Sequence, residues 1–534
     1  MTITLHRYIV KDLLKTFLLA TVGLTVVLSL GSILQPAQEY GVSPAQALLL
    51  IVYFIPVILT FVMPISALFA AALTYGRFAS DNELDACRAS GVSTLNLMLS
   101  ALMLAVLVSV ANLLLNFYVV PHFISKTEQN IKANVRNIVF RSIEKQGYYD
   151  FSDSSRGSNT YILADKVDLN EDVLLGVNIL QTKGGKAKSL TSVSQADVDF
   201  ESTDSYNYIS AVAQDVYQAD ASGVIYSQKL PIKGKFAPLL LDNIRFKKLS
   251  DLKAIKNDVL LFNPVDDYAN SVLVRLRSEM LAEAISRRSE DSSSRYYQLN
   301  SDQKIVMLSA SESEVGSSDN VISLTDVSLY EYSMDNPDEL LNKWVSSSGT
   351  LDINDQWGQG SWTLVLDNAV WTDKNGVTGL PISYSVRGIY TPQDISNDLD
   401  GYKLEVIQNV TPITESEKLQ RLKAEFDDLL AETSAAMAVE MNSRMVLGLG
   451  CILLVLCGAA LGVLFKGGHA LTSFGISVVP AGILIVFIMM GRNLTKNIVR
   501  NQGGTGELGI LLMWAGLLVL LVLLLYIYKK LLKT

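Results

Sequence analysis

Basic side chains stand near the ends of several long apolar stretches in this sequence, where they could bind phosphate. Guanidinium and ammonium groups are frequent protein ligands of phosphate oxygens, to which they donate charge-assisted hydrogen bonds. The candidates are Lys126, Lys132, Arg136, Arg444 and Arg492. Arg444 is the strongest of them, because it stands at the entrance to an apolar helix. The alternative interpretation is that these cations touch ordinary anionic phospholipid head groups or balance nearby carboxylates.

A polar loop between the second and third apolar stretches holds another candidate site. It reads RFASDNELDACRASGVS. Ser80 and Glu83 have the spacing of a capping box, and Gly91 stands where a glycine commonly ends a helix. The loop therefore predicts a short helix over residues 81–90. Glu83 could merely complete the cap, or Glu83 and Arg88 could belong to a helix that inserts into a partner protein.

No pattern typical of a catalytic or cofactor site occurs in the sequence. The three histidines all lie close to the ends of apolar stretches, and the carboxylates are scattered, so no metal-ligand cluster is predicted. A phosphate-binding glycine loop and a nucleophile elbow are also missing. The three cysteines lie outside the long polar middle of the chain, which excludes a disulfide framework there. We therefore expect no cofactor and no enzymatic activity.

Composition indicates that a membrane protein positions these candidate sites. Of the 534 residues, 49% are hydrophobic and 18% are charged, and the mean hydropathy is +0.28. Six uncharged runs are long enough to cross a bilayer, which needs about 20 residues. These runs are 16–34, 47–75, 95–120, 445–465, 470–491 and 508–528. A cleaved signal peptide is the rival interpretation of the first run, but no convincing cleavage site follows it, so we expect an uncleaved helix.

Lysine and arginine in the short loops predict the orientation of the six helices. The segment before the first run and the loop between the second and third are basic, whereas the loop after the first run has neither residue. Both termini are therefore predicted to face the cytoplasm. Arg492, Lys496 and Arg500 run against this trend in a predicted outer loop, which makes Arg492 the second choice for phosphate binding. The predicted domains are 1–120 with three helices, 121–444 outside the membrane, and 445–534 with three more helices.

The long polar middle reads as β structure with two helical interruptions. Alternating or β-branched runs lie at 160–164, 174–182, 208–213, 321–332 and 362–371. Turn signals separate them, so the pattern predicts an antiparallel sandwich instead of an alternating α/β enzyme. Residues 265–289 have helical periodicity, and a serine-rich stretch follows. A second helix is predicted to start at the capping box of Thr414 and Glu417 and to lead towards the fourth membrane run.

The order of several motifs resembles the LptF/LptG permease family, the membrane subunits of the ABC transporter that extracts lipopolysaccharide from the inner membrane. The similar segments are 6–9 before the first run, 82–91 in the polar loop, 161–164 and 194–198 in the middle, and the pair Glu440 and Arg444 before the fourth run. In the polar loop, Glu83, Arg88 and Gly91 follow in the order of the family's coupling helix. The middle segment is longer than the family norm, with the helical and serine-rich stretches as insertions.

This resemblance implies a polytopic α-helical membrane protein in the bacterial inner membrane. It would have six transmembrane helices, three on each side of an inserted antiparallel β-jellyroll-like extracytoplasmic domain. The implied function is that of a permease subunit that extracts lipopolysaccharide or a related glycolipid. The jellyroll would receive the acyl chains in an apolar groove, and the candidate cations would hold the phosphates of the lipid.

The resemblance also implies several partners, and nucleic acid is not among them. A cytoplasmic, LptB-like ATPase dimer would dock on the predicted helix 81–90 through Glu83 and Arg88, because this chain has no ATP-binding motif of its own. A second six-span permease subunit would complete the cavity, and an LptC/LptA-like periplasmic bridge protein would receive the lipid. Nothing in the sequence separates an F-type from a G-type subunit.

Two other functions compete with this interpretation. A membrane-anchored sensor or scaffold would carry an extracytoplasmic binding domain, but a sensor usually adds a cytoplasmic signalling domain, and here the cytoplasmic segments are short. The nearer rival is an ABC permease for another lipid. Permeases with four spans and one inserted domain are disfavoured by the six runs.

The orientation predicts which cysteines react from outside the cell. With the native cysteines removed and the outer membrane permeabilised, an impermeant thiol reagent should label a single cysteine introduced at Ser317 in whole cells. A single cysteine kept at Cys87 should be protected, because it would face the cytoplasm. Labelling at Cys87 together with protection at Ser317 would overturn the orientation.

Overall fold

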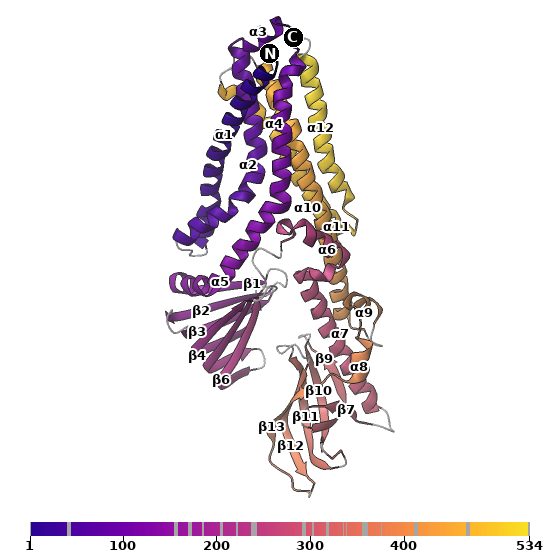
Figure 1. The fold of residues 1–534 in the computed structure, drawn as a ribbon. Helices are drawn as coiled ribbons and strands as arrows, with labels where there is room; N and C mark the ends of the chain where they lie inside the picture. The colour runs from indigo at the N-terminus through magenta and orange to yellow at the C-terminus, as the bar shows by residue number, and fades with distance from the viewer. Residues whose placement is uncertain are drawn as a thin grey trace. The chain divides into compact units, whose positions relative to one another are not determined.

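The chain folds into two compact units in a computed structural model (Figure 1). The first unit comprises Met1–Val259 and Ala431–Thr534, and the second comprises Leu260–Leu430. The described residues are 2–39, 44–153, 158–168, 173–183, 186–202, 207–220, 223–236, 243–290, 295–301, 304–316, 320–334, 336–337, 339–354, 361–374, 376–410, 415–465 and 470–531. The predicted middle segment 121–444 is thus divided between the two units.

Long helices form the first unit, and six of them contain apolar windows long enough to span a membrane within the described residues. The helices are α1 (Thr2–Glu39), α2 (Pro44–Ser80), α4 (Thr94–Leu114), which continues through the π-helical turn η1 (Leu115–Val119) into α5 (Val120–Gln146), α10 (Glu417–Leu464), α11 (Ala470–Gln502) and α12 (Glu507–Leu531). The predicted six-helix arrangement is confirmed. Many leucines on α1 and α12 are exposed, which is typical of surfaces that face lipid.

Proline and asparagine residues shape the packing of α2 against α4. Pro64 has no N–H, so the carbonyl of Thr60 one turn earlier loses its helical donor. Asn112 of α4 is fully buried and its Nδ2 donates to this carbonyl at 2.8 Å. Because water cannot satisfy such a carbonyl inside a membrane, the amide joins the two helices at the proline.

Two glycines let α10 approach α2 closely. Gly458 and Gly462 are four residues apart, the spacing of the G-x-x-x-G motif that brings membrane helices into contact. A Cβ atom at Gly458 would lie 2.5 Å from the carbonyl oxygen of Leu68, and one at Gly462 would lie 2.5 Å from that of Ala72. This contact therefore joins helices from the two ends of the sequence.

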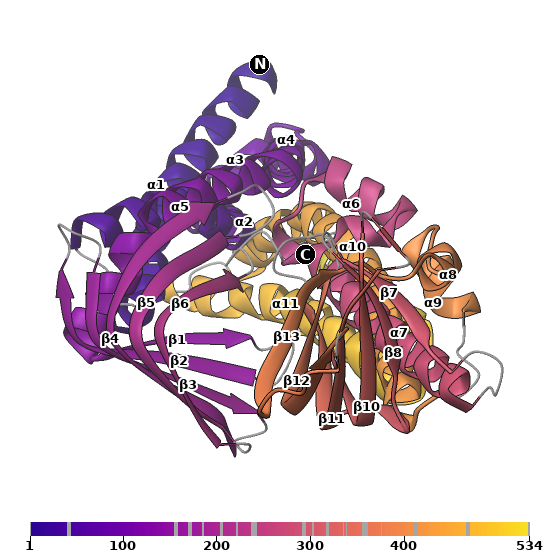
Figure 2. The same cartoon turned by 90° about the horizontal axis from the view of Figure 1, so that it is seen from below.

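Six antiparallel strands follow α5 in the first unit. They are β1 (Tyr148–Asp153), β2 (Ser158–Asp168), β3 (Val173–Lys183), β4 (Lys186–Ser202), β5 (Asn207–Asp220) and β6 (Gly223–Phe236), paired in sequence order. Gly176 and Asp215 have positive φ angles and interrupt the regular pairing of their strands, and such irregularities increase the coiling of a sheet. The strands curve strongly, as Figure 2 shows, and the sheet forms a curled half-barrel.

One face of this sheet packs on α5. Val139, Phe140 and Ile143 of the helix form a buried cluster with side chains such as Val177 and Val193 of the strands. A short 3₁₀ turn, η2 (Ile244–Phe246), and helix α6 (Leu249–Asn257) complete the first unit before the chain enters the second.

The second unit has its own sheet and core. Helices α7 (Asn263–Glu290), α8 (Gln393–Asp398) and α9 (Lys403–Asn409) accompany strands β7 (Tyr297–Asn300), β8 (Lys304–Ser309), β9 (Glu312–Val315), β10 (Val321–Ser333), β11 (Leu340–Asn354), β12 (Ser361–Asp373) and β13 (Ile382–Ile389). The order is β13-β12-β11-β10-β8-β7, with β9 beside β10, and a bridge between Ser301 and Ile389 brings the two edges together. Leu281 and Ile285 of α7 pack into a core that includes Trp362.

These elements confirm the predicted antiparallel strands and the helix predicted at 265–289. The serine-rich stretch that follows lies largely outside the described residues, as does Thr414. The cap at the start of α10 differs from the prediction, because Ser416 performs that role: its Oγ accepts from the N–H of Leu419 at 3.1 Å. Ser416 also lies beside the buried ion pair of Arg275 and Glu279, which holds the hydroxyl at this position.

The helix contact at the glycines predicts that added bulk there destabilises the protein. Gly458→Val and Gly462→Val should lower the unfolding temperature of the detergent-solubilised chain, because overpacking costs about 1–3 kcal/mol per site. Gly482→Val in α11 is the matched control, since a Cβ atom there meets nothing within 4 Å. An equal loss in all three variants, measured by thermal unfolding, would show that helix composition matters and the contact does not.

Candidate coupling helix and phosphate site

The polar loop forms helix α3 (Glu83–Ala89), shorter than the predicted 81–90. The predicted capping box is wrong, because α2 continues through Ser80 and the N-cap position falls on Asn82. Asn82 has φ +58° and its side chain makes no capping hydrogen bond. The predicted end is confirmed: Gly91 has φ +83°, and its N–H donates to the carbonyl of Arg88 at 2.9 Å.

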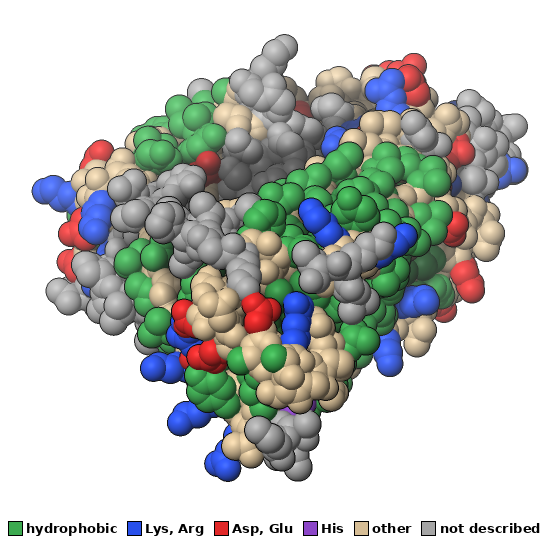
Figure 3. Space-filling view, turned by 90° about the horizontal axis from the view of Figure 1, so that it is seen from above, with side chains coloured by type: hydrophobic (Ala, Val, Ile, Leu, Met, Phe, Trp, Pro, Cys, Tyr) green, Lys and Arg blue, Asp and Glu red, His purple; other side chains and the backbone are tan. Residues whose placement is uncertain are grey.

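One face of helix α3 packs against the other helices, and the other face is exposed. Leu84 is buried in the helical core beside Phe78 and Leu97, whereas Glu83 is exposed. Arg88 is half-buried, with its Nη1 3.9 Å from the Asp85 carboxylate. Figure 3 looks onto the end of the helices that carries α3 in Figure 1; broad hydrophobic areas are visible there, with charged side chains among and around them. A carboxylate held on an anchored helix can contact a protein that approaches this end.

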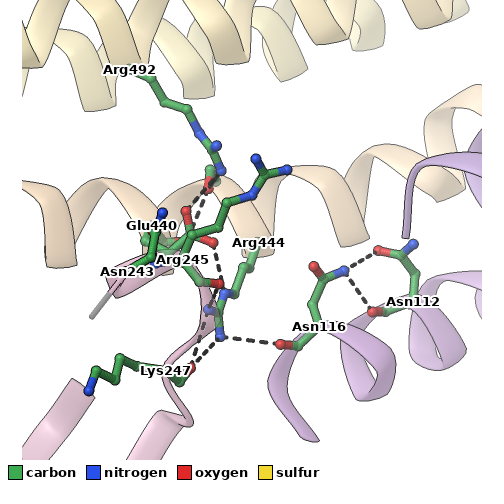
Figure 4. A network of polar contacts seen from close by, with 9 residues as sticks. Asn112, Asn116, Asn243, Arg245, Lys247, Glu440, Arg444 and Arg492 are labelled. Carbon is green, nitrogen blue, oxygen red and sulfur yellow. Dashed lines mark hydrogen bonds and ion pairs between the residues drawn. The ribbon is translucent and has the colours of Figure 1, made fainter. Parts of the chain in front are cut away.

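Arg444 lies at the centre of a polar network in the first unit (Figure 4). Its side chain is 3% exposed, and its Nε donates to Glu440 Oε1 at 3.0 Å within α10. The other guanidinium nitrogens donate to the carbonyls of Asn116 at 3.2 Å, Arg245 at 2.8 Å and Lys247 at 3.3 Å. Since protein atoms engage every nitrogen of the guanidinium, Arg444 is placed to hold these segments together.

Irregular backbone supplies these carbonyls. Asn116 lies in the π-helical turn η1, where the N–H of Val120 donates to the carbonyl of Leu115 instead of that of Asn116, and the next residue, Pro121, has no N–H to donate. The guanidinium of Arg444 also lies over the Phe117 ring, 5.6 Å from its centroid. The carbonyls of Arg245 and Lys247 belong to η2 and the residue after it. The Asn116 carbonyl is therefore left for the guanidinium of Arg444.

Arg492 contributes a second guanidinium to the network. Its Nη2 donates to Glu440 Oε2 at 2.9 Å and to Ser443 Oγ at 2.7 Å, and its side chain is 32% exposed. Its Nε is buried and has no hydrogen-bond partner among the described residues. The prediction that Arg492 lies in a short loop is wrong: α11 extends to Gln502, and the next turn places Lys496 3.9 Å from Glu432 of α10.

Arg245 is a third guanidinium near Glu440, and sequence reasoning missed it. Although the residue is exposed overall, burial of its charged end by surrounding protein and the proximity of Arg492 and Arg444 lower the pKa of Arg245, while Glu440 acts in the opposite direction. Its guanidinium lies over the Phe61 ring, 5.5 Å from the centroid. The only sequence signal was a basic stretch after Asn243. Three arginines around one carboxylate leave an excess of positive charge, which favours an anionic ligand.

The remaining predicted cations lie on α5. Lys126 is exposed, and Arg136 is half-buried with its guanidinium 6.0 Å from the Phe140 ring centroid. Arg136 follows Asn116 by 20 residues, about 30 Å along a helix. The side chain of Lys132 lies outside the described residues. The structure therefore brings Arg444 and Arg492 together and places Lys126 and Arg136 along a different helix.

Taken together, these features define a class of protein: a multi-pass helical membrane protein with inserted antiparallel sheets and a short exposed helix between two spans. No cluster of metal-ligating side chains occurs in the described parts of the chain. A family model described as "Lipopolysaccharide export system permease LptF/LptG" matches residues 7–530. The chain belongs to the LptF/LptG family of transport permease subunits, and it is a multi-pass protein of the inner membrane. A search of curated proteins finds no match.

Proposed function

We propose that this chain is a permease subunit of an ABC transporter that extracts lipopolysaccharide or a related glycolipid from the inner membrane and passes it to a periplasmic bridge protein. The observation that carries the proposal is the family match over residues 7–530, nearly the whole chain. The arginine network supports it, because a phosphorylated glycolipid needs cations at its head group.

In this proposal, ATP is hydrolysed by a separate cytoplasmic ATPase dimer that docks on α3. Exposed Glu83 contacts the ATPase directly, and Arg88 supports the interface from its half-buried position. A second six-span subunit completes the cavity. Only 22% of the apolar window in α1 is buried within this chain, so α1 has surface for such a partner as well as for lipid.

The curled sheet β1–β6 lies in the periplasm in this proposal and receives the acyl chains. Leu163, Leu175 and Val212 are exposed on it, whereas Leu174 and Ala213 next to two of them are buried on the α5 side. Leu163 and Leu175 pair across the strands with Asn178 and Gln195, so this face is mixed in polarity. The continuous apolar face of the sheet is the one of Val177 and Val193 beside α5, and it is the face suited to lipid chains. Among the described residues β6 pairs only with β5, so its free edge supports strand addition by the bridge protein.

The lipid phosphate is held by Arg492 and Arg245, whose side chains are less buried than that of Arg444. Arg444 acts by positioning, since its donors already reach Glu440 and backbone carbonyls. Lys126 and Arg136 of α5 are further candidates for contacts with the lipid phosphates, as is Lys132, whose side chain lies outside the described residues.

Coupling is tested by recovery of the complex from membranes. Affinity purification of the tagged chain should recover an ATPase and a second six-span chain. Glu83→Ala should reduce ATPase recovery strongly, because loss of a charge-assisted contact at an interface costs about 2–5 kcal/mol. Membrane insertion should be unchanged.

The matched control for this experiment is Asp81→Ala, which removes an exposed carboxylate two residues away. Equal losses of ATPase in both variants would assign Glu83 a general electrostatic effect and contradict a specific docking role. Recovery of the chain without any ATPase or permease partner would contradict the transporter assignment itself.

Phosphate binding is tested with photocrosslinking residues at positions 245 and 492 in native membranes. Both positions should crosslink to the phosphorylated glycolipid substrate, because they replace the side chains proposed to contact it. Position 496, one turn further along α11 and 61% exposed, is the control and should crosslink mainly to phospholipid. Substrate crosslinks confined to other helices would remove Arg245 and Arg492 from the site.

A further inference from the structure

Glu440 is a single carboxylate shared between two guanidinium groups. Its Oε1 accepts from Arg444 at 3.0 Å and its Oε2 accepts from Arg492 at 2.9 Å, and its side chain is only 10% exposed. Figure 4 shows Arg492 and Arg444 reaching Glu440 from different helices, with Arg245 beside them. The carboxylate thus occupies the place between cations that an anionic ligand would take.

The two arginine contacts of Glu440 are unequal. Arg444 is 3% exposed and backbone carbonyls from two other segments fix it. Arg492 is 32% exposed, its side chain donates to Glu440 and Ser443, and its Nε is a buried donor without a partner in the described part of the chain. Opening the Arg492 contact would leave Glu440 still paired with Arg444, so no buried charge would lose its last partner.

We propose that Glu440 is an internal counter-ion that an incoming lipid phosphate displaces from Arg492, and that this exchange selects phosphomonoester over phosphodiester head groups. The inference rests on the phosphate site of the proposed function and adds a specificity-determining residue to it. In the exchanged state, the phosphate contacts Arg492 and Arg245 while Glu440 remains on Arg444.

Selectivity follows from the charge of the competitor. A phosphodiester carries one negative charge, as the carboxylate does, and the carboxylate has the advantage of being tethered at high effective concentration. A phosphomonoester carries about −1.5 to −2 charges near neutral pH and has three acceptor oxygens. It therefore makes contacts with both Arg492 and Arg245 that a phosphodiester cannot match. To bind, a head group must interact with Arg492 more favourably than Glu440 does.

The test is a lipid competition on the full-length chain purified with its complex partners. Phosphatidic acid, a phosphomonoester, and phosphatidylglycerol, a phosphodiester, are supplied in equal amounts with identical acyl chains, and bound lipid is measured by native mass spectrometry. Lipid that the native chain binds but the Arg492→Ala variant does not is counted as bound at the site. The native chain should prefer phosphatidic acid at the site by about tenfold or more, and Glu440→Gln should bring the ratio close to one by admitting phosphatidylglycerol.

Two further variants keep the test decisive. Ser443→Ala removes the second acceptor of Arg492 while the Glu440–Arg444 pair stays intact, so it should lower the ratio part of the way even if Glu440→Gln fails to fold. Glu432→Gln, two turns earlier on α10 and paired with Lys496, should leave the ratio unchanged. Inorganic phosphate in molar excess should displace little of the lipid; complete displacement would assign the site to the free ion and overturn the lipid proposal.

The remaining outcomes separate this inference from the function on which it rests. If Arg492→Ala removes no bound lipid, the phosphate site itself is wrong and the inference falls with it. If Arg492→Ala removes both lipids but the native chain holds them equally, the site stands and the exchange is overturned. An unchanged preference in both Glu440→Gln and Ser443→Ala would also overturn it.

Discussion

The buried pair of Arg444 and Glu440 is the contact on which the centre of the first unit depends. A guanidinium withdrawn from water is tolerated only when a carboxylate and further acceptors surround it, and removing one partner of such a pair typically costs about 3–5 kcal/mol. Here the acceptors come from η1 and from the turn at Arg245, so one side chain of α10 fixes two segments that are remote in sequence. The same carboxylate then reaches α11 through Arg492.

The irregular backbone of the helices is connected to this arrangement. Prolines inside membrane helices free carbonyls that lipid cannot satisfy, and here side chains of neighbouring helices supply the donors. Asn112 does so at the carbonyl exposed by Pro64, and Arg444 does so at the π turn before Pro121. Close helix contact at Gly458 and Gly462 adds packing that needs no polar group. Positions that would each weaken an isolated helix together specify which helices lie side by side.

The second unit enlarges the middle of the chain without depending on the curled sheet for its core. Its strands surround buried side chains that include Trp362, and α7 contributes Leu281 and Ile285 to the same core. A separate core lets Leu260–Leu430 form a compact unit of its own. The alternating strands, which the sequence predicts as one sandwich, form two sheets. The sequence could not show this, because strand periodicity indicates which faces are buried but not which strand lies opposite.

Local sequence patterns determined the six membrane helices, the strand positions, the helix at 265–289 and the glycine that ends α3, because apolar length, alternation and glycine geometry act within a few residues. The motif order also identified the family. Tertiary structure alone decided the arginine network, since Arg444 meets carbonyls 328 and 199 residues away. It brought in Arg245, extended α11 past Arg492, and moved the start of α3 from the Ser80 cap to Asn82. Charges have no periodicity, so their partners become visible only when distant segments are placed beside one another. The Ser80 cap failed for another reason, since α2 continues through that residue.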